Sequence, residues 1–92
     1  MPFTDIQKAK FIALLETKGW EFREGTVWSP RRGLWFDDAH FAEWSPADLR
    51  DLFARRAARL ERYEHTELSG ASGENLQASW AAGEIMKDDR DA

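Results

Sequence analysis

Five arginines lie close together in one stretch of the sequence, in the order Arg50, Arg55, Arg56, Arg59 and Arg62. On a helix, Arg55, Arg59 and Arg62 share one face, because their spacing is i, i+4, i+7. A row of guanidinium groups can bind phosphate, so this face is a candidate nucleic-acid-binding surface.

Acidic residues in the same stretch argue for a plainer interpretation. Asp48, Asp51 and Glu61 share the predicted helix, and Asp51 and Arg55 have the i, i+4 spacing of a favourable helical ion pair. The chain as a whole has a net charge of −4, whereas a nucleic-acid binder usually presents a strongly basic domain. We therefore favour a solvated helix face over a nucleic-acid-binding one.

A second candidate surface is formed by Trp28 and Trp35, which fall on neighbouring strands of a predicted antiparallel meander. If residues 24–25 and 30–33 are the two loops, Trp28 lies opposite Trp35, on the same face as Arg23. Tryptophan and arginine are enriched in the hot spots of protein interfaces. Stacked aromatic rings on a sheet can also bind single-stranded nucleic acid.

Two alternatives for this face need no foreign partner. Exposed pairs of tryptophans are rare on monomers, so the C-terminal segment, with Leu76, Trp80, Ile85 and Met86, could fold back over the pair. The same segment could cover the pair on a second copy, which would make a homodimer. We weigh self-cover or dimerisation ahead of another protein, and another protein ahead of nucleic acid.

Catalytic and cofactor chemistry has little support in the sequence. Asp37, Asp38, His40 and Glu43 have ligand types that suit divalent metals. However, they include one imidazole, lack a recognised ligand spacing and fall in a predicted loop. No glycine-rich phosphate loop is present, and no serine has a visible base. We therefore expect no enzyme activity, no metal site and no cofactor.

Composition places the chain among small globular proteins. Its 92 residues are 42% hydrophobic and 33% charged, and they include five tryptophans and no cysteine. No apolar run is long enough to span a membrane, and the first residues lack a signal-peptide pattern. A cytoplasmic location is the default expectation.

The N-terminal residues predict a helix that ends near Gly19. Thr4 is a good N-cap, and Gln7 completes a capping box three residues later. Gly19 is placed to end the helix in a left-handed conformation, with Trp20 closing a Schellman motif. An apolar stripe for the core is supplied by Ile6, Phe11, Leu14 and Leu15.

The meander follows this helix, and its alternation predicts a core face. That face consists of Trp20, Phe22, Val27, Leu34 and Phe36. Beyond the meander, residues 37–44 are compatible with a helical turn that lays Phe41 and Trp44 on the core.

Ser45, Pro46 and Asp48 mark a helix start, and apolar residues then recur at helical spacing to about Tyr63. After it the composition shifts. Residues 1–63 hold 11 basic and 10 acidic side chains, whereas residues 64–92 hold 2 basic and 7 acidic ones. We predict a single α+β domain over residues 1–66, then a linker and flexible acidic tail over 67–92 with a short helix at 75–86 as an option.

The predicted fold is an α-β-β-β-α two-layer sandwich, with a three-stranded antiparallel meander covered on one face by two helices. This element order resembles that of double-stranded-RNA-binding domains and of small HicA-type toxin ribonucleases, in which a helix ending in Gly-Trp or Gly-Phe leads into a hairpin. The HicA-type enzymes carry a histidine early in the sheet, where this sequence has Arg23 to Thr26. No catalytic role is therefore carried over.

The sequence thus favours a small non-enzymatic interaction module that uses Trp28, Trp35 and Arg23 to meet a protein partner or a second copy. The alternative is a nucleic-acid-binding domain that uses Arg55, Arg59 and Arg62. No membrane partner is expected.

Overall fold

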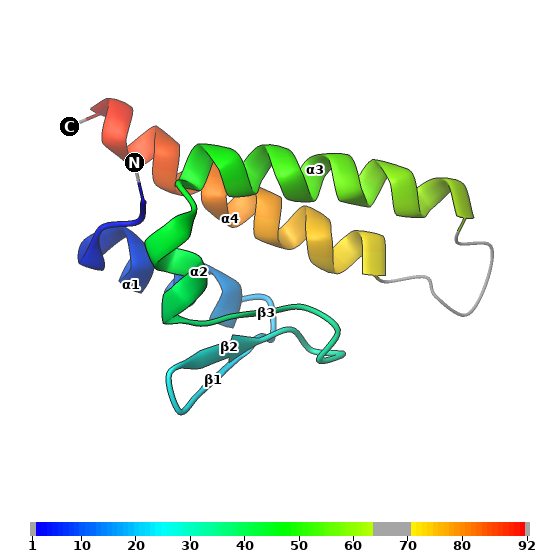
Figure 1. The fold of residues 1–92 in the computed structure, drawn as a ribbon, viewed down its shortest axis with the longest axis horizontal. Coiled ribbons are helices and arrows are strands. Elements are labelled where there is room, and N and C mark those ends of the chain that lie inside the picture. The colour runs from blue at the N-terminus through cyan, green and yellow to red at the C-terminus, as the bar shows by residue number, and fades with distance from the viewer. Residues whose placement is uncertain (1, 64–70, 92) are drawn as a thin grey trace.

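A computed structural model of the chain describes residues 2–63 and 71–91 (Figure 1). The elements follow the order α1 (Asp5–Glu16), β1 (Glu21–Arg23), β2 (Thr26–Trp28), β3 (Trp35–Phe36), α2 (Asp38–Glu43), α3 (Pro46–Tyr63) and α4 (Ala71–Asp91). The fold is α+β with a three-stranded antiparallel sheet, as predicted. It differs from the predicted two-layer sandwich because the described residues form four helices instead of two.

The sheet has the strand order β1-β2-β3 and the register that the loop lengths predicted. The β1–β2 turn uses Glu24 and Gly25, whose φ angles of 53° and 79° are those of a two-residue hairpin loop. The β2–β3 loop is closed by Ser29, which donates its N–H to the Leu34 carbonyl at 2.8 Å. The Ser29 hydroxyl oxygen also accepts the Leu34 N–H at 3.1 Å. These two loops fix which residues share a face.

Helix α1 begins and ends as predicted. The Thr4 hydroxyl oxygen accepts the Gln7 N–H, and the Gln7 side chain accepts the Thr4 N–H, so both halves of the capping box are present. Gly19 has a φ of 92°, and Trp20 donates its N–H to the Leu15 carbonyl at 3.1 Å in the Schellman arrangement. The end of α1 therefore sets the position at which β1 starts.

Residues 38–43 form the short helix α2, and Phe41 is buried as predicted. Trp44, by contrast, remains 36% exposed. Helix α3 then starts at Pro46, and the Ser45 hydroxyl oxygen accepts the Asp48 N–H at 3.1 Å. Because Ser45 caps α3 immediately after α2 ends, the chain turns sharply between the two helices.

The C-terminal segment differs most from the prediction. Instead of a flexible acidic tail, residues 71–91 form the helix α4, which runs antiparallel beside α3 (Figure 1). The predicted short helix at 75–86 lies inside it. Of the predicted linker, residues 71–73 belong to the first turn of α4, and residues 67–70 lie outside the described residues. The helix is held to α3 where the Ser79 hydroxyl donates to the Arg50 carbonyl at 2.8 Å and where Gly83, which lacks a Cβ, lies beside Arg50. It also buries Ala78, Ala81, Ala82 and Ile85 completely.

The core draws on the sheet and on all four helices. Its buried members include Phe11 and Leu15 of α1, Val27 and Phe36 of the sheet, and Ile85 of α4, each 0% exposed. Side chains from α4 thus complete a core that the sequence assigned to residues 1–66 alone.

Two residues besides Trp44 that were predicted for this core are exposed, which corrects the sequence interpretation. Phe22 is 46% exposed, because β1 is the outer strand and lies farthest from α3 and α4 (Figure 1). Ile6 is 72% exposed. It precedes Phe11 by five residues, which places it about 140° around α1 from the buried side chain of Phe11.

Candidate functional site

The pair of Trp28 and Trp35 lies on the sheet face that points away from the core. The β2–β3 register places the two residues directly opposite each other, as predicted. Their ring centroids are 5.9 Å apart, and the ring planes are inclined by 35°. Trp35 is 42% exposed, and Trp28 is half-buried. The sheet therefore holds a preformed aromatic surface at the solvent boundary.

Helix α2 supports this surface through His40, a contact that sequence reasoning missed. The His40 ring packs against Trp35 with 4.9 Å between centroids and an angle of 75° between planes. His40 is fixed in turn, because its Nδ1 lies 2.7 Å from Oδ1 of Asp37. Asp37 also caps α2 by accepting the N–H groups of Ala39 and His40. The sequence did contain a signal for this contact: His40 follows Asp37 by three residues, which is the spacing of a capping box.

The Asp37 cap predicts a specific pH dependence of stability. The hydrogen bond from the His40 side chain lowers the pKa of Asp37, and the N–H groups of His40 and Ala39 act in the same direction. The cap therefore stabilises the fold fully above the unfolded-state pKa, about 3.9. This stabilisation is lost as the pH falls through the lower folded-state pKa.

Urea unfolding of the wild type and of Asp37→Asn, measured at several pH values from neutral to strongly acidic, checks this expectation. The substituted amide keeps a capping oxygen but does not titrate. We expect the wild type to be the more stable protein near neutral pH and the gap to close below about pH 4. Parallel stability curves over the whole range would contradict the expectation, since the other carboxyl groups titrate in both proteins.

Arg23 and Arg32 border the tryptophan pair on the sheet. Arg23 Nε lies 3.1 Å from Oε2 of Glu21, and Arg32 Nη2 lies 3.9 Å from the same oxygen. These side chains are at least half exposed, so the ion pairs contribute at most about 1 kcal/mol. A shallow hollow of about 340 Å³ is lined by Arg23, Glu24, Thr26, Trp28 and Arg32. Arg23 therefore lies beside Trp28, as predicted, and can exchange its weak pairing for a partner.

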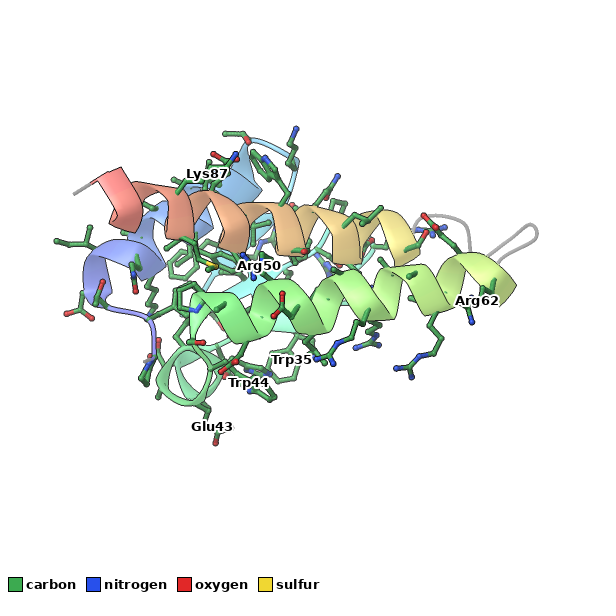
Figure 2. All side chains as sticks on the ribbon, turned by 90° about the horizontal axis from the view of Figure 1, so that it is seen from above. Trp35, Glu43, Trp44, Arg50, Arg62 and Lys87 are labelled. Carbon is green, nitrogen blue, oxygen red and sulfur yellow. The ribbon has the colours of Figure 1, made fainter. Side chains whose placement is uncertain are left out.

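The arginines of α3 are positioned by the packing of α3 against α4. Arg50 faces α4: a Cβ on Gly83 would lie 3.6 Å from Arg50 Cδ, and Figure 2 shows Arg50 between the two helices. Arg59 follows Arg50 by nine residues, or about 180° around the helix, and Arg55 lies about 140° from it. Arg55, Arg59 and Arg62 are all exposed. Arg55 and Arg59 thus project from the flank of α3 opposite α4.

The tryptophan surface lies on this same flank. Figure 2, which looks down onto α3, shows Trp35 and Trp44 on the side of α3 away from α4, with Arg62 toward the far end of the helix. The sequence placed the tryptophans and the arginines on separate surfaces. The structure instead gives them a common flank, and we call the surface formed by Trp28, Trp35, Trp44, Arg55, Arg59 and Arg62 the tryptophan–arginine flank.

The expected ion pair between Asp51 and Arg55 is not the one that forms. Asp51 Oδ1 accepts from Arg50 Nε at 3.0 Å, while Arg55 Nε donates to the backbone carbonyl of Asp51 at 3.3 Å. The predicted pair of Asp51 with Arg55 is therefore wrong, although Arg55 is exposed to solvent. Its charge is left for solvent or for a partner.

Helix α4 does not cover the tryptophan pair, which corrects the expectation of self-cover by the described part of the C-terminal segment. Trp80 and Leu76 lie elsewhere, lining a shallow hollow of about 210 Å³ with Lys18 and Gln77. Lys18 Nζ sits 4.9 Å from the centre of the Trp80 ring. The Gln77 side chain accepts the indole N–H of Trp20 at 2.7 Å. Trp80 thus belongs to the junction of α4 with α1.

Comparison with known proteins adds no assignment: the chain matches no protein-family profile, no curated protein and no solved structure. The likeness to RNA-binding domains and HicA-type enzymes is therefore confined to element order. None of the helices in residues 2–63 and 71–91 combines the length and apolar character that crossing a membrane requires. Among the side chains that the structure describes, those of residues 2–62 and 72–87, no three histidine or carboxylate groups converge on a point that could hold a metal ion.

Proposed function

We propose that this chain is a small non-enzymatic protein-interaction module, and that its binding surface is centred on Trp28 and Trp35. The observation that carries the proposal is a cross-strand tryptophan pair, with Trp28 half-buried and Trp35 exposed, that α4 leaves uncovered. Tryptophan and arginine dominate the binding energy of many protein interfaces, and Arg23 lies beside the pair.

The pair is also held in place before any partner arrives. The Trp35 ring packs against both Trp28 and His40, while Asp37 fixes His40. Rings that are already ordered lose little conformational freedom on binding, so more of the contact energy appears as affinity. We infer that the partner is a different protein, which inserts an apolar or aromatic side chain beside Trp35.

A random-peptide library displayed on phage tests this proposal, because selection from it does not require the partner to be identified first. Peptides selected on the wild-type protein are measured against Trp28→Ala, Trp35→Ala and Trp80→Ala by fluorescence anisotropy. Trp80 is the matched control, because its 39% exposure is close to the 42% of Trp35. We expect the first two variants to weaken binding at least about tenfold, or 1.4 kcal/mol, and Trp80→Ala to leave it nearly unchanged.

Three results would contradict the proposal. The library could yield no binders, or the selected peptides could bind Trp35→Ala as well as they bind the wild type. Light scattering provides the third: a wild-type dimer that Trp35→Ala converts to monomer would identify a second copy as the partner. Circular dichroism of each variant confirms that a loss of binding is not a loss of fold.

Nucleic-acid binding is a second candidate. Helix geometry puts Arg55 and Arg59 on the flank of α3 opposite α4, and Figure 2 shows Trp35 on that side of α3. Stacking on tryptophan combined with arginine contacts to phosphate is a known mode of single-strand binding. Binding of a single-stranded RNA oligonucleotide that falls steeply with salt and disappears in Arg55→Ala/Arg59→Ala would support this candidate.

A further inference from the structure

The basic side chains outside the second half of α3 largely have acidic neighbours. Lys8 pairs with Asp38, Arg23 and Arg32 with Glu21, Arg50 with Asp51, and Lys87 with Glu84. Arg55, Arg59 and Arg62 differ: among the described side chains, those of residues 2–62 and 72–87, none of them has a carboxylate within ion-pair distance. An acidic protein therefore carries a local surplus of positive charge on one flank of one helix.

The sequence of α3 explains this surplus. Its acidic residues Asp48 and Asp51 lie in the first two turns, and Asp51 is already paired with Arg50. In the second half, Glu61 is two residues from Arg59 and one from Arg62, and side chains at these spacings do not face each other on a helix. The surplus of positive charge thus follows from the order of residues along α3. Asp48 and Asp51 lie before Arg55, and the arginines without a paired carboxylate begin at Arg55.

Acidic groups are distributed in the opposite way along the tryptophan–arginine flank. Glu21 and Glu24 adjoin Trp28, and Glu43 precedes Trp44 at the end of α2 (Figure 2). Arg23 and Arg32 border the same tryptophans and pair with Glu21, so the tryptophan end has three carboxylates against two guanidinium groups. The surface is therefore aromatic and close to neutral at one end, and basic at the other. A ligand that fits it carries an apolar anchor at one end and negative charge at the other.

We propose that the tryptophan–arginine flank binds an acidic linear peptide segment of a partner protein. An aromatic or aliphatic anchor of the segment contacts Trp28, Trp35 and Trp44. The carboxylates that follow the anchor pair with Arg55, Arg59 and Arg62, whose planar guanidinium groups match carboxylates in two-point contacts. This inference rests on the proposed function, and it adds the chemistry of the partner.

This difference in charge between the two ends of the tryptophan–arginine flank disfavours a nucleic acid as the ligand. A nucleic-acid strand carries a negative charge at every nucleotide, so its phosphates would also lie at the tryptophan end. There the carboxylates of Glu21, Glu24 and Glu43 outnumber the guanidinium groups of Arg23 and Arg32. In addition, Trp28 and His40 already pack against the Trp35 ring. These contacts leave less of the Trp35 ring free to stack on a base than the aromatic rings of single-strand-binding proteins offer. A peptide can confine its carboxylates to the arginine end.

The test repeats the phage selection with two libraries that share a randomised aromatic or aliphatic anchor. In one library the following positions are drawn from Asp, Glu, Asn and Gln, and in the other from Lys, Arg, Asn and Gln. Selected peptides are then measured against Arg55→Glu/Arg59→Glu and against Lys10→Glu/Lys87→Glu. The second variant changes the net charge equally at two exposed sites outside the tryptophan–arginine flank.

We expect binders only from the acidic library, with Asp and Glu enriched over Asn and Gln. Their affinity should fall at least about tenfold in Arg55→Glu/Arg59→Glu and less than about threefold in the control. The milder Arg55→Gln/Arg59→Gln should weaken binding in the same direction, and circular dichroism should show both proteins folded. Selected peptides in which Lys replaces the acids should regain affinity for Arg55→Glu/Arg59→Glu.

The contrary outcomes are distinct. Binders that need Trp35 but show no acidic preference and ignore the arginine variants would overturn this inference and leave the proposed function standing. The absence of any Trp35-dependent binder would overturn both. A single-stranded oligouridine that binds at least as tightly as the best acidic peptide, with Arg55 and Arg59 required, would replace the peptide by nucleic acid.

Discussion

The chain shortened to residues 1–66 is expected to lose its cooperative fold. Ala78, Ala81, Ala82 and Ile85 of α4 are each 0% exposed, so removing them opens the core along its whole contact with α3 and α1. Replacing a single buried isoleucine by alanine costs about 2–5 kcal/mol. Loss of the whole buried face exceeds the total stability of a small domain, about 5–15 kcal/mol.

Near-UV circular dichroism and the dispersion of amide signals in an NMR spectrum measure this loss directly. The matched control is the chain ending at Lys87, which keeps all four of these buried residues of α4 and should unfold cooperatively like the full chain. A cooperative transition and an unchanged near-UV spectrum for residues 1–66 would show instead that this segment is an autonomous domain. The sequence-based division into a domain and a tail would then be correct.

Sequence reasoning failed to predict the packing of α4 for a physical reason. The helix meets α3 at Ser79 and Gly83 and buries Ala78, Ala81 and Ala82, all of them small residues with little hydrophobic signal. The more visible signals, the glycines and serines of 69–73 and the acidic residues at the end, are typical of linkers and tails. Close packing between helices is a property of pairs of surfaces, and the pattern of one segment does not reveal it.

The sheet was predictable to the level of individual residue pairs. Its register depends on two short loops, and Glu24–Gly25 and 30–33 both have residue types that specify their loop lengths. Once the loops are set, the pairing of Trp28 with Trp35 follows from the alternation of side chains. Local chemistry therefore determines this part of the site.

The common flank of the tryptophans and arginines could not be predicted in the same way. It depends on the angle at which α3 crosses the sheet and on the rotation of α3 about its own axis. That rotation is set by the contact of Arg50 with Gly83 of α4 and by the hydrogen bond from the Ser79 hydroxyl to the Arg50 carbonyl at 2.8 Å. Both contacts come from the segment whose packing the sequence did not reveal. The position of Arg55 and Arg59 is thus a consequence of α4.

Phe36→Ala is expected to be among the most destabilising single substitutions in the sheet. Phe36 is 0% exposed, and its ring centroid lies 5.1 Å from that of Phe11, 5.5 Å from Phe53 and 6.0 Å from Trp20. It therefore joins the sheet to α1 and α3 at one point. Removing such a ring costs about 3–5 kcal/mol, because the transfer free energy is lost and a cavity remains.

Urea unfolding followed by circular dichroism gives the change in the free energy of unfolding, with the slope against denaturant as a check that both proteins unfold in one step. Phe22→Ala is the matched control, since it removes the same ring from the same sheet face, at a position that is 46% exposed. We expect that variant to lose less than about 1 kcal/mol. Equal losses of unfolding free energy in the two variants would mean that the helices bury Phe36 no more completely than Phe22. Phe36 would then not belong to the core. If Phe36→Ala loses several times as much unfolding free energy as Phe22→Ala, the contacts of Phe36 with the helices stabilise the sheet that carries the tryptophan pair.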